Sequence, residues 1–235
     1  MQTAARAGLP THALLTDMNE VLGYSAGNAL EIREVVAYLR GDAREPRLDE
    51  VVRALCAEML LLTGIETAIA AAHDRVDAAL ASGAAAERFE RMVAGLGGPA
   101  NFLDTAGEQL PGAAVTRPVY PDTDGWLDSV DTRAVGNAVI ELGGGRRALD
   151  DALDLATGFS DIVRIGSRVS ANEPIATVHA ASEDDAMRAA TSYSAACRVT
   201  ERRPDERPVI CSIRRADESS ANTSRPGAGP AGEAV

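Results

Sequence analysis

Residues 23–27, with the sequence GYSAG, form a GxSxG pattern that could expose a nucleophilic serine. In such a site Ser25 would attack a substrate carbonyl and His179 would accept its proton. The serine must follow a strand directly, and an earlier loop must help to stabilise the oxyanion. The strand-like run before it ends near Thr16, and nothing upstream could supply that loop. We therefore interpret the pattern as a glycine-rich turn before a helix.

Residues 143–147, GGGRR, could hold an anion through backbone N–H groups and the guanidinium groups of Arg146 and Arg147. A phosphate-binding P-loop needs a lysine, and all 23 basic residues of this chain are arginine. The run is also typical of a flexible loop between strands. The sequence leaves these two interpretations open.

The absence of lysine excludes an ammonium nucleophile and a Schiff base. Residues 158–179 resemble half of a lipoyl- or biotin-carrying β-sandwich, but no lysine exists to carry either group. A carrier function is therefore excluded, whereas that architecture is not.

Glu31 and Glu34 lie three residues apart on one helix face, a spacing that suits a cation site and also an ordinary solvated face. The histidines, His12, His73 and His179, are isolated in the sequence and show no metal-binding spacing. We interpret each histidine as structural or surface-exposed.

The composition excludes several classes of protein. With 35 acidic and 23 basic residues the net charge is −12, which disfavours a nucleic-acid partner. The three cysteines are too few and too far apart for a disulfide framework or a zinc site. The most apolar stretch, residues 51–65, contains charged residues, and no secretion signal opens the chain. A soluble cytoplasmic protein without membrane contact is expected.

The first 100 residues alternate helix-like segments with glycine breaks. Residues 1–8 are typical of a helix end and residues 11–16 of a strand, as in the second half of a βαβ unit, and the edge of this strand is expected to lack neighbours. Asn28 can cap the next helix. The helix after it, residues 48–62, is apolar nearly all round and is expected to be buried. The predicted helices cover residues 28–39, 48–62, 66–81 and 84–94.

From residue 115 onward short β-type runs predominate, separated by Gly, Pro, Asn and Asp. The predicted strands are residues 115–119, 125–130, 138–142, 161–165, 174–178 and 208–213. Residues 183–197 predict a helix, and residues 216–235 are typical of a disordered tail. The fold class expected from these patterns is α/β, with an α-rich part followed by a β-rich module.

Several motifs resemble the thymidine and pyrimidine-nucleoside phosphorylase family, in the same order over about residues 1–215. The motifs are LLTDMN at 14–19, LGY at 22–24, GNALEIRE at 27–34, VY at 119–120, DTDG at 122–125, DTRAVG at 131–136, GGGR at 143–146 and GFSD at 158–161. The resemblance implies that residues 1–105 are the remainder of a mixed-sheet α/β phosphorylase domain. It implies that residues 115–200 are a small C-terminal module resembling a barrel-sandwich.

The resemblance also implies a reaction. Inorganic phosphate, as co-substrate, attacks the anomeric carbon of thymidine or a related pyrimidine deoxynucleoside and releases the base and 2-deoxyribose 1-phosphate, in nucleoside salvage and catabolism. A site for this reaction must position phosphate and stabilise negative charge on the leaving base. In the family these groups come from a Gly/Ser/Thr/Lys-rich loop and from a His, an Arg, a Ser and a Lys.

None of those motifs stands in this sequence, so we assign no catalytic residue and leave the substrate-binding residues unknown. The expectation is a C-terminal part of the enzyme that is inactive alone. The alternative is a non-catalytic lobe that binds a separately encoded N-terminal half. A homodimer, as in family members, is the other partner that the resemblance implies.

The resemblance further implies a potassium site. Its ligands here would be the backbone oxygens of Leu22 and Ser25 and the carboxylate of Glu34. By the same analogy the loop at residues 143–147 would help to close the cleft over substrate.

Overall fold

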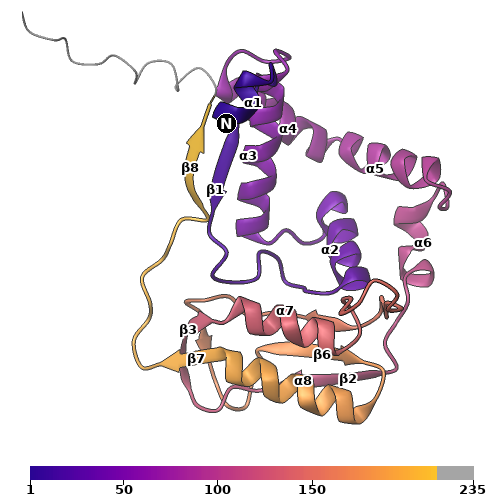
Figure 1. Cartoon of the computed structure of the whole chain (residues 1–235), viewed down its shortest axis with the longest axis vertical. Helices are drawn as coiled ribbons and strands as arrows, with labels where there is room; N and C mark the ends of the chain where they lie inside the picture. The colour runs from indigo at the N-terminus through magenta and orange to yellow at the C-terminus, as the bar shows by residue number, and fades with distance from the viewer. Residues whose placement is uncertain (216–235) are drawn as a thin grey trace, which may run out of the picture.

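The computed structural model describes residues 1–215, which form eight helices and eight strands (Figure 1). The disordered tail predicted at residues 216–235 lies outside the described residues. Within the described part of the chain, no helix is both long and apolar enough to cross a membrane. The mixture of helices and short strands confirms the predicted α/β class.

The first half of the chain is helical apart from one strand. Its second helix ends at Gly41, whose φ of 80° provides the left-handed cap that glycine adopts at little cost. The predicted helices are present, and a short one after residue 100 was not predicted. The elements are α1 (Gln2–Arg6), β1 (Ala13–Thr16), α2 (Asn28–Arg40), α3 (Pro46–Leu62), α4 (Ile69–Ala81), α5 (Ala84–Gly95) and α6 (Phe102–Gln109).

The second half forms a module of two three-stranded antiparallel sheets with two helices. The strand orders are β2–β6–β4 and β5–β3–β7. All strand pairs in residues 1–215 are antiparallel and close no barrel, so the mixed sheet and the barrel-like module expected from the resemblance are not observed. The elements are β2 (Val115–Val119), β3 (Gly125–Val130), α7 (Thr132–Glu141), β4 (Gly158–Ser160), β5 (Arg168–Val169), β6 (Ala176–Ala180), α8 (Glu183–Ala196) and β7 (Cys197–Thr200).

The core of this module collects apolar side chains from both sheets and both helices. The rings of Phe159 and Tyr193 lie at its centre, with their centroids 4.9 Å apart. Burial of these aliphatic and aromatic groups is the main force that stabilises the module. Its buried residues include Val119, Leu127, Val135, Ile175, Val178 and Ala186.

The last described strand, β8 (Ile210–Arg214), returns to the first half and pairs antiparallel with β1. The prediction that β1 lacks neighbours is therefore wrong for one of its two edges. A partner nearly 200 residues away cannot be recognised from local pattern, although a strand near this position was predicted.

Three predicted strands were misplaced. Residues 138–142 belong to α7 and its end, where Leu142 N donates to Ala138 O. Their apolar residues recur at helical spacing, which a short window does not distinguish from a strand. Residues 161–165 form no strand and instead follow β4, and the run predicted at 174–178 lies two residues later, in β6.

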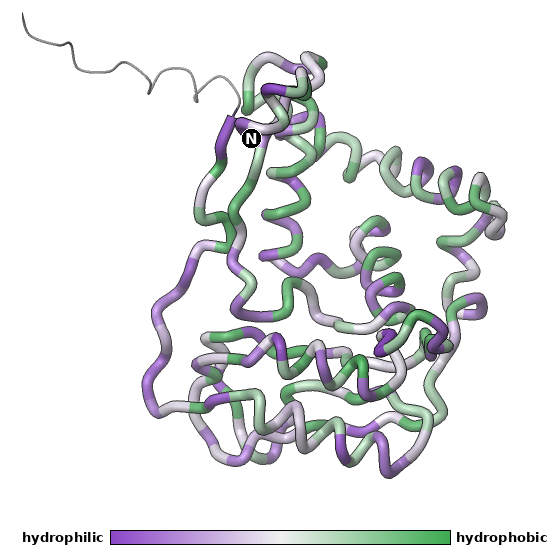
Figure 2. Tube along the Cα trace, viewed as in Figure 1, coloured by the Kyte–Doolittle hydropathy of each residue, from purple (hydrophilic) through white to green (hydrophobic). Residues whose placement is uncertain are grey.

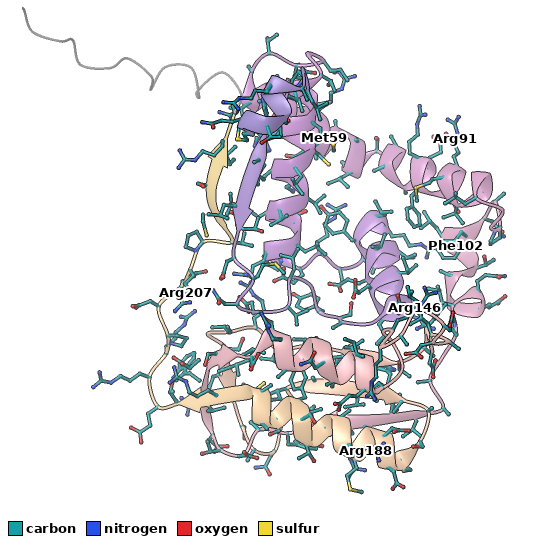
Figure 3. All side chains as sticks on the ribbon, in the orientation of Figure 1. Met59, Arg91, Phe102, Arg146, Arg188 and Arg207 are labelled. Atoms are coloured by element: carbon teal, nitrogen blue, oxygen red, sulfur yellow. The ribbon has the colours of Figure 1, made fainter. Side chains whose placement is uncertain are left out.

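The prediction that α3 is buried all round is also wrong. Leu55 and Met59 are 46% and 57% exposed, while Arg47 and Glu58 are buried. Figure 2 shows hydrophobic residues along most of α3, and Figure 3 shows Met59 on the side of α3 away from β1. The helix therefore exposes an apolar stripe and buries charged side chains that find partners.

Glu58 ties α3 to the β1–β8 pair and gives a pH prediction. Its carboxylate accepts hydrogen bonds from Arg215 and lies 2.8 Å from His12 Nδ1. The Arg215 hydrogen bond, followed by the one to His12, holds the pKa of Glu58 below its usual 4.5, although burial opposes this. A carboxyl with a lowered folded pKa stabilises the protein above its unfolded pKa and loses this contribution as the pH falls through the folded pKa.

The effect of Glu58→Gln on the free energy of unfolding is expected to depend on pH. The difference in the free energy of unfolding between wild type and this variant should be largest near neutral pH and should shrink below about pH 4.5. Urea unfolding followed by circular dichroism at several pH values measures it. Glu50→Gln, on the exposed face of the same helix, is the control and should show little difference at any pH. A Glu58→Gln effect that stays constant into acid would contradict the prediction.

Candidate functional site

The turn at residues 22–27 joins the helical half to the β-rich module. Ala26 and Phe159 form an isolated antiparallel bridge with N···O distances of 2.9 and 2.8 Å. Ile162 N donates to Tyr24 O at 3.0 Å. Two motifs that lie more than 130 residues apart in the sequence, LGY and GFSD, thus meet at one place.

Two glycines make this approach possible. Gly27 and Gly158 have φ values of 147° and 144°, where other residues are strained. A Cβ atom on Gly158 would lie 2.1 Å from Ala26 O, and one on Gly27 would lie 2.4 Å from Thr157 O. The backbones therefore pass each other with no room for a side chain.

The turn is organised around the carboxylate of Glu34, which projects from α2. Tyr24 N donates to Glu34 Oε1 at 2.7 Å, and Ser25 Oγ donates to Glu34 Oε2. Gly23 packs against the same carboxylate, because a Cβ there would lie 2.5 Å from Glu34 Oε1. Glu34 thus fixes the conformation of the turn through charge-assisted hydrogen bonds.

Asn28 does not cap α2 as predicted. Gly27 is the N-cap residue and has no side chain to bond, while Asn28 is the first helical residue. The Asn28 amide instead donates to Gly144 O at 2.9 Å. The Glu31 carboxylate accepts from Gly27 N at 3.0 Å and takes over the capping role.

The three residues predicted to bind a cation lie around this turn. Ser25 is buried, and Leu22 and Glu34 are partly buried. Within residues 1–215, no hydrogen bond is made to the carbonyl oxygens of Leu22 or Ser25. No group of three His, Cys, Asp or Glu residues suited to a metal ion occurs there. The predicted donor set is one carboxylate with backbone oxygens, a kind of set that hard cations such as potassium prefer. Both Glu34 oxygens also accept hydrogen bonds within the turn, and the cation site stays a prediction.

Ser25 is not an activated nucleophile. Its hydroxyl is buried and donates to Glu34, and β1 ends nine residues before it. His179, the base considered for it, lies with Nε2 2.9 Å from Ser160 Oγ instead. This agrees with the interpretation of residues 23–27 as a turn.

A polar cluster that the sequence did not predict surrounds His179 on β6. Ser160 Oγ donates to Asp161 Oδ2 at 2.8 Å and also contacts the imidazole. Burial lowers the pKa of His179, the charge of Arg33 lowers it further, and Asp161 opposes both effects. Asp161 has a φ of 53°, which is uncommon for a residue other than glycine. Because β4 and β6 are neighbours only in the folded sheet, spacing gave no signal for this cluster.

The GGGRR run does not connect strands, and three of its five backbone N–H groups donate within the protein. It follows the C-terminus of α7, where the Gly143 and Gly144 N–H groups donate to Ile140 O and Val139 O, each at 3.0 Å. The N–H group of Arg147 donates to Asp151 Oδ2 at 2.8 Å, as does that of the next residue. A helix C-terminus also carries partial negative charge. These donors are therefore used within the protein, and Figure 3 places Arg146 near the start of α2.

A surface groove of about 680 Å³ runs between β2 and α8. Its walls include Thr116, Tyr120, Met187 and Ser194, and none of the residues predicted to bind a ligand lines it. The structure therefore gives this groove no link to the turn at residues 22–27.

These observations define an α/β protein in which a helical half contacts a small two-sheet module through glycine-rich turns. The family model of the pyrimidine nucleoside phosphorylase C-terminal domain matches residues 126–200. The matched part extends from β3 to β7 and includes both module helices. The match confirms, for this module, the family resemblance that the motifs indicate.

Proposed function

We propose that this chain serves pyrimidine-nucleoside phosphorolysis, as the C-terminal part of a thymidine phosphorylase-type enzyme. The observation that carries the proposal is the module at residues 126–200, which matches the C-terminal domain of that family. The junction between LGY, GNALEIRE and GFSD adds support, because these family-like motifs converge on one turn. The reaction would be attack of phosphate on the anomeric carbon of a pyrimidine deoxynucleoside.

We further propose that the 235-residue chain does not catalyse this reaction by itself. Phosphorolysis needs cationic and hydroxyl groups that grip phosphate and stabilise the leaving base. The chain has no lysine, and three of the five backbone N–H groups of its GGGRR loop already donate within the protein. This chain would then contribute to the structure of the enzyme and would supply none of the groups that bind phosphate or the base.

The test is an ultraviolet assay of thymidine consumption in phosphate buffer. The purified chain alone is expected to show no turnover above background, and activity should appear when it is mixed with the lysine-containing N-terminal half of a pyrimidine nucleoside phosphorylase. Robust turnover by the chain alone would contradict the proposed inactivity. Absence of activity in every mixture would contradict the proposed function.

The alternative function is that of an interaction lobe that binds a separately encoded N-terminal half without contributing to catalysis. The exposed stripe on α3 favours it, because Leu55, Met59 and Leu62 project at helical spacing and are at least a third exposed. The free edge of β1 and the exposed Leu15 lie in the same half of the chain. This function predicts that the chain co-purifies with such an N-terminal half. Met59→Lys should abolish the co-purification, and Met92→Lys, at an exposed methionine on α5, should not.

The proposed potassium site gives a ligand prediction. At equal ionic strength, potassium should raise the melting temperature above that in sodium by roughly 2–4 °C, equivalent to about 1 kcal/mol. Glu34→Gln should abolish the difference, because it removes the only carboxylate of the donor set. Glu31→Gln, on the same helix, is the control and should retain it. Equal melting temperatures of the wild type in both salts would argue against the site.

A further inference from the structure

The outward face of the sheet β5–β3–β7 carries the only tryptophan of the chain. Along β3 the side chains alternate, so that Gly125 and Leu127 are buried and Trp126 is half-buried. Trp126 lies opposite Arg168 of β5 and Thr200 of β7. The sheet thus places an arginine and an indole side by side.

A second arginine reaches the same ring from the segment after β7. The guanidinium carbon of Arg203 lies 5.5 Å from the indole centroid, and that of Arg168 lies 6.0 Å from it. Both separations are within the range of a cation–π contact. Contact with the ring restricts the two long side chains and keeps each charge within 6.0 Å of the ring centroid.

Neither guanidinium is neutralised by a direct partner. In residues 1–215 the guanidinium groups of Arg168 and Arg203 form no ion pair and no hydrogen bond, and both residues are exposed. The carboxylates nearby are engaged elsewhere. Asp124 accepts from Ala171 N at 2.7 Å, with Arg168 acting on it only at longer range, and Asp128 pairs with Arg198.

Charge is concentrated along the same segment. Residues 198–207 carry the arginines Arg198, Arg202, Arg203 and Arg207 and the acids Glu201, Asp205 and Glu206. Figure 2 shows the connection from β7 to β8 as mostly hydrophilic, and Figure 3 places Arg207 on it. The net charge of this segment is +1, in a chain whose net charge is −12.

We propose that Trp126, Arg168 and Arg203 form a binding site for a phosphate dianion, either free or as a small sugar monoester. The two guanidinium groups at this ring carry like charges, which one dianion bound between them would neutralise, whereas a carboxylate carries a single charge. Each guanidinium edge also matches the spacing of phosphate oxygens. The site is separate from the turn at residues 22–27 and does not depend on the proposed reaction.

The fluorescence of Trp126 reports on this site without any label, because no other tryptophan is present. The full chain is titrated at constant ionic strength, at about pH 8, where phosphate is mostly the dianion. The probes are inorganic phosphate and ribose 5-phosphate, with chloride as the reference anion. We expect a saturable change with a dissociation constant on the order of 1 mM for at least one phosphate probe.

Arg168→Gln and Arg203→Gln should each weaken binding about tenfold, measured also by calorimetry because these changes alter the fluorescence directly. The matched control is Arg188→Gln on α8, an exposed arginine that pairs with Asp185 and makes no contact with Trp126, which should bind as the wild type does. Saturation by inorganic phosphate identifies free phosphate as a ligand, and saturation by the monoester alone identifies the sugar phosphate. A linear response shared with chloride, or binding unchanged in both arginine variants, would overturn the proposal.

Discussion

Replacing Arg47 with methionine is expected to lower the free energy of unfolding by about 3–5 kcal/mol. The Arg47 side chain is only 6% exposed, its Nε lies 3.0 Å from Glu20 Oε1, and Nη2 lies 3.7 Å from Asp17 Oδ2. Both carboxylates are at least nine-tenths buried. Without the guanidinium, two negative charges would stay buried close to each other, and this accounts for the size of the effect.

The same change should loosen the contact between the two halves of the chain. Glu20 Oε2 accepts a hydrogen bond from Ile165 N at 2.9 Å, so the carboxylate that pairs with Arg47 also holds the module. A second ion pair lies at the same junction, where Nε of the partly exposed Arg164 lies 3.1 Å from Oε1 of the buried Glu45. Neither arginine has hydrogen-bond alignment at Nε, so these pairs act mainly through charge.

Urea unfolding of Arg47→Met and of Arg53→Met, on the same helix, provides the comparison. Arg53 is partly exposed and pairs with Asp49 and Asp77. Arg53→Met should therefore lower the free energy of unfolding by only about 0.5–1 kcal/mol. Adding Asp17→Asn and Glu20→Gln to Arg47→Met should recover much of the lost stability, because no uncompensated charge remains. If Arg47→Met and Arg53→Met lower the free energy of unfolding equally, the burial of the Arg47 ion pairs does not determine the size of the effect.

Local signals predicted much of the secondary structure. The strand at residues 115–119 and the one at 125–130 have the predicted bounds, since turn residues flank both. The helix α8 begins where Ser182 accepts from Asp185 N, a capping pattern readable in the sequence. The end of α2 at Gly41 follows from the conformational freedom of glycine.

Contacts between distant segments could not be predicted from local pattern. The burial of Arg47 and Glu58 on a helix that reads as apolar depends on partners at Asp17, Glu20 and Arg215. The pairing of β1 with β8 likewise depends on the path of the whole chain. Helical periodicity and strand alternation describe which residues prefer burial, and they do not identify the partner.

Some residues of the candidate site could be grouped from the sequence, and others are brought together only by the fold. Leu22, Ser25 and Glu34 lie within thirteen residues of each other, and the resemblance was enough to group them. The cluster of Ser160, Asp161 and His179 requires the register of β4 against β6, in which Gly158 lies opposite His179. Only the folded sheet brings those side chains into contact.

Gly158→Ala should lower the free energy of unfolding by about 3 kcal/mol or more, because it forces apart the backbones that meet at the junction. The added methyl group would lie 2.1 Å from Ala26 O and 2.9 Å from Gly27 Cα. Both neighbours are backbone atoms, so relief requires separation of the segments that form the Ala26–Phe159 bridge. The strain of a φ of 144° adds to this clash.

Gly166→Ala separates the clash from the effect of backbone strain alone. Gly166 has a φ of 85°, but a Cβ there would meet no atom within 4 Å. Gly166→Ala should therefore lower the free energy of unfolding by only about 1 kcal/mol. Hydrogen exchange at the amides of Ala26 and Phe159 should accelerate in Gly158→Ala and stay near the wild-type rate in Gly166→Ala, because only the former opens the bridge. Equal exchange rates and equal stability losses in the two variants would mean that the close approach at Gly158 does not join the two halves.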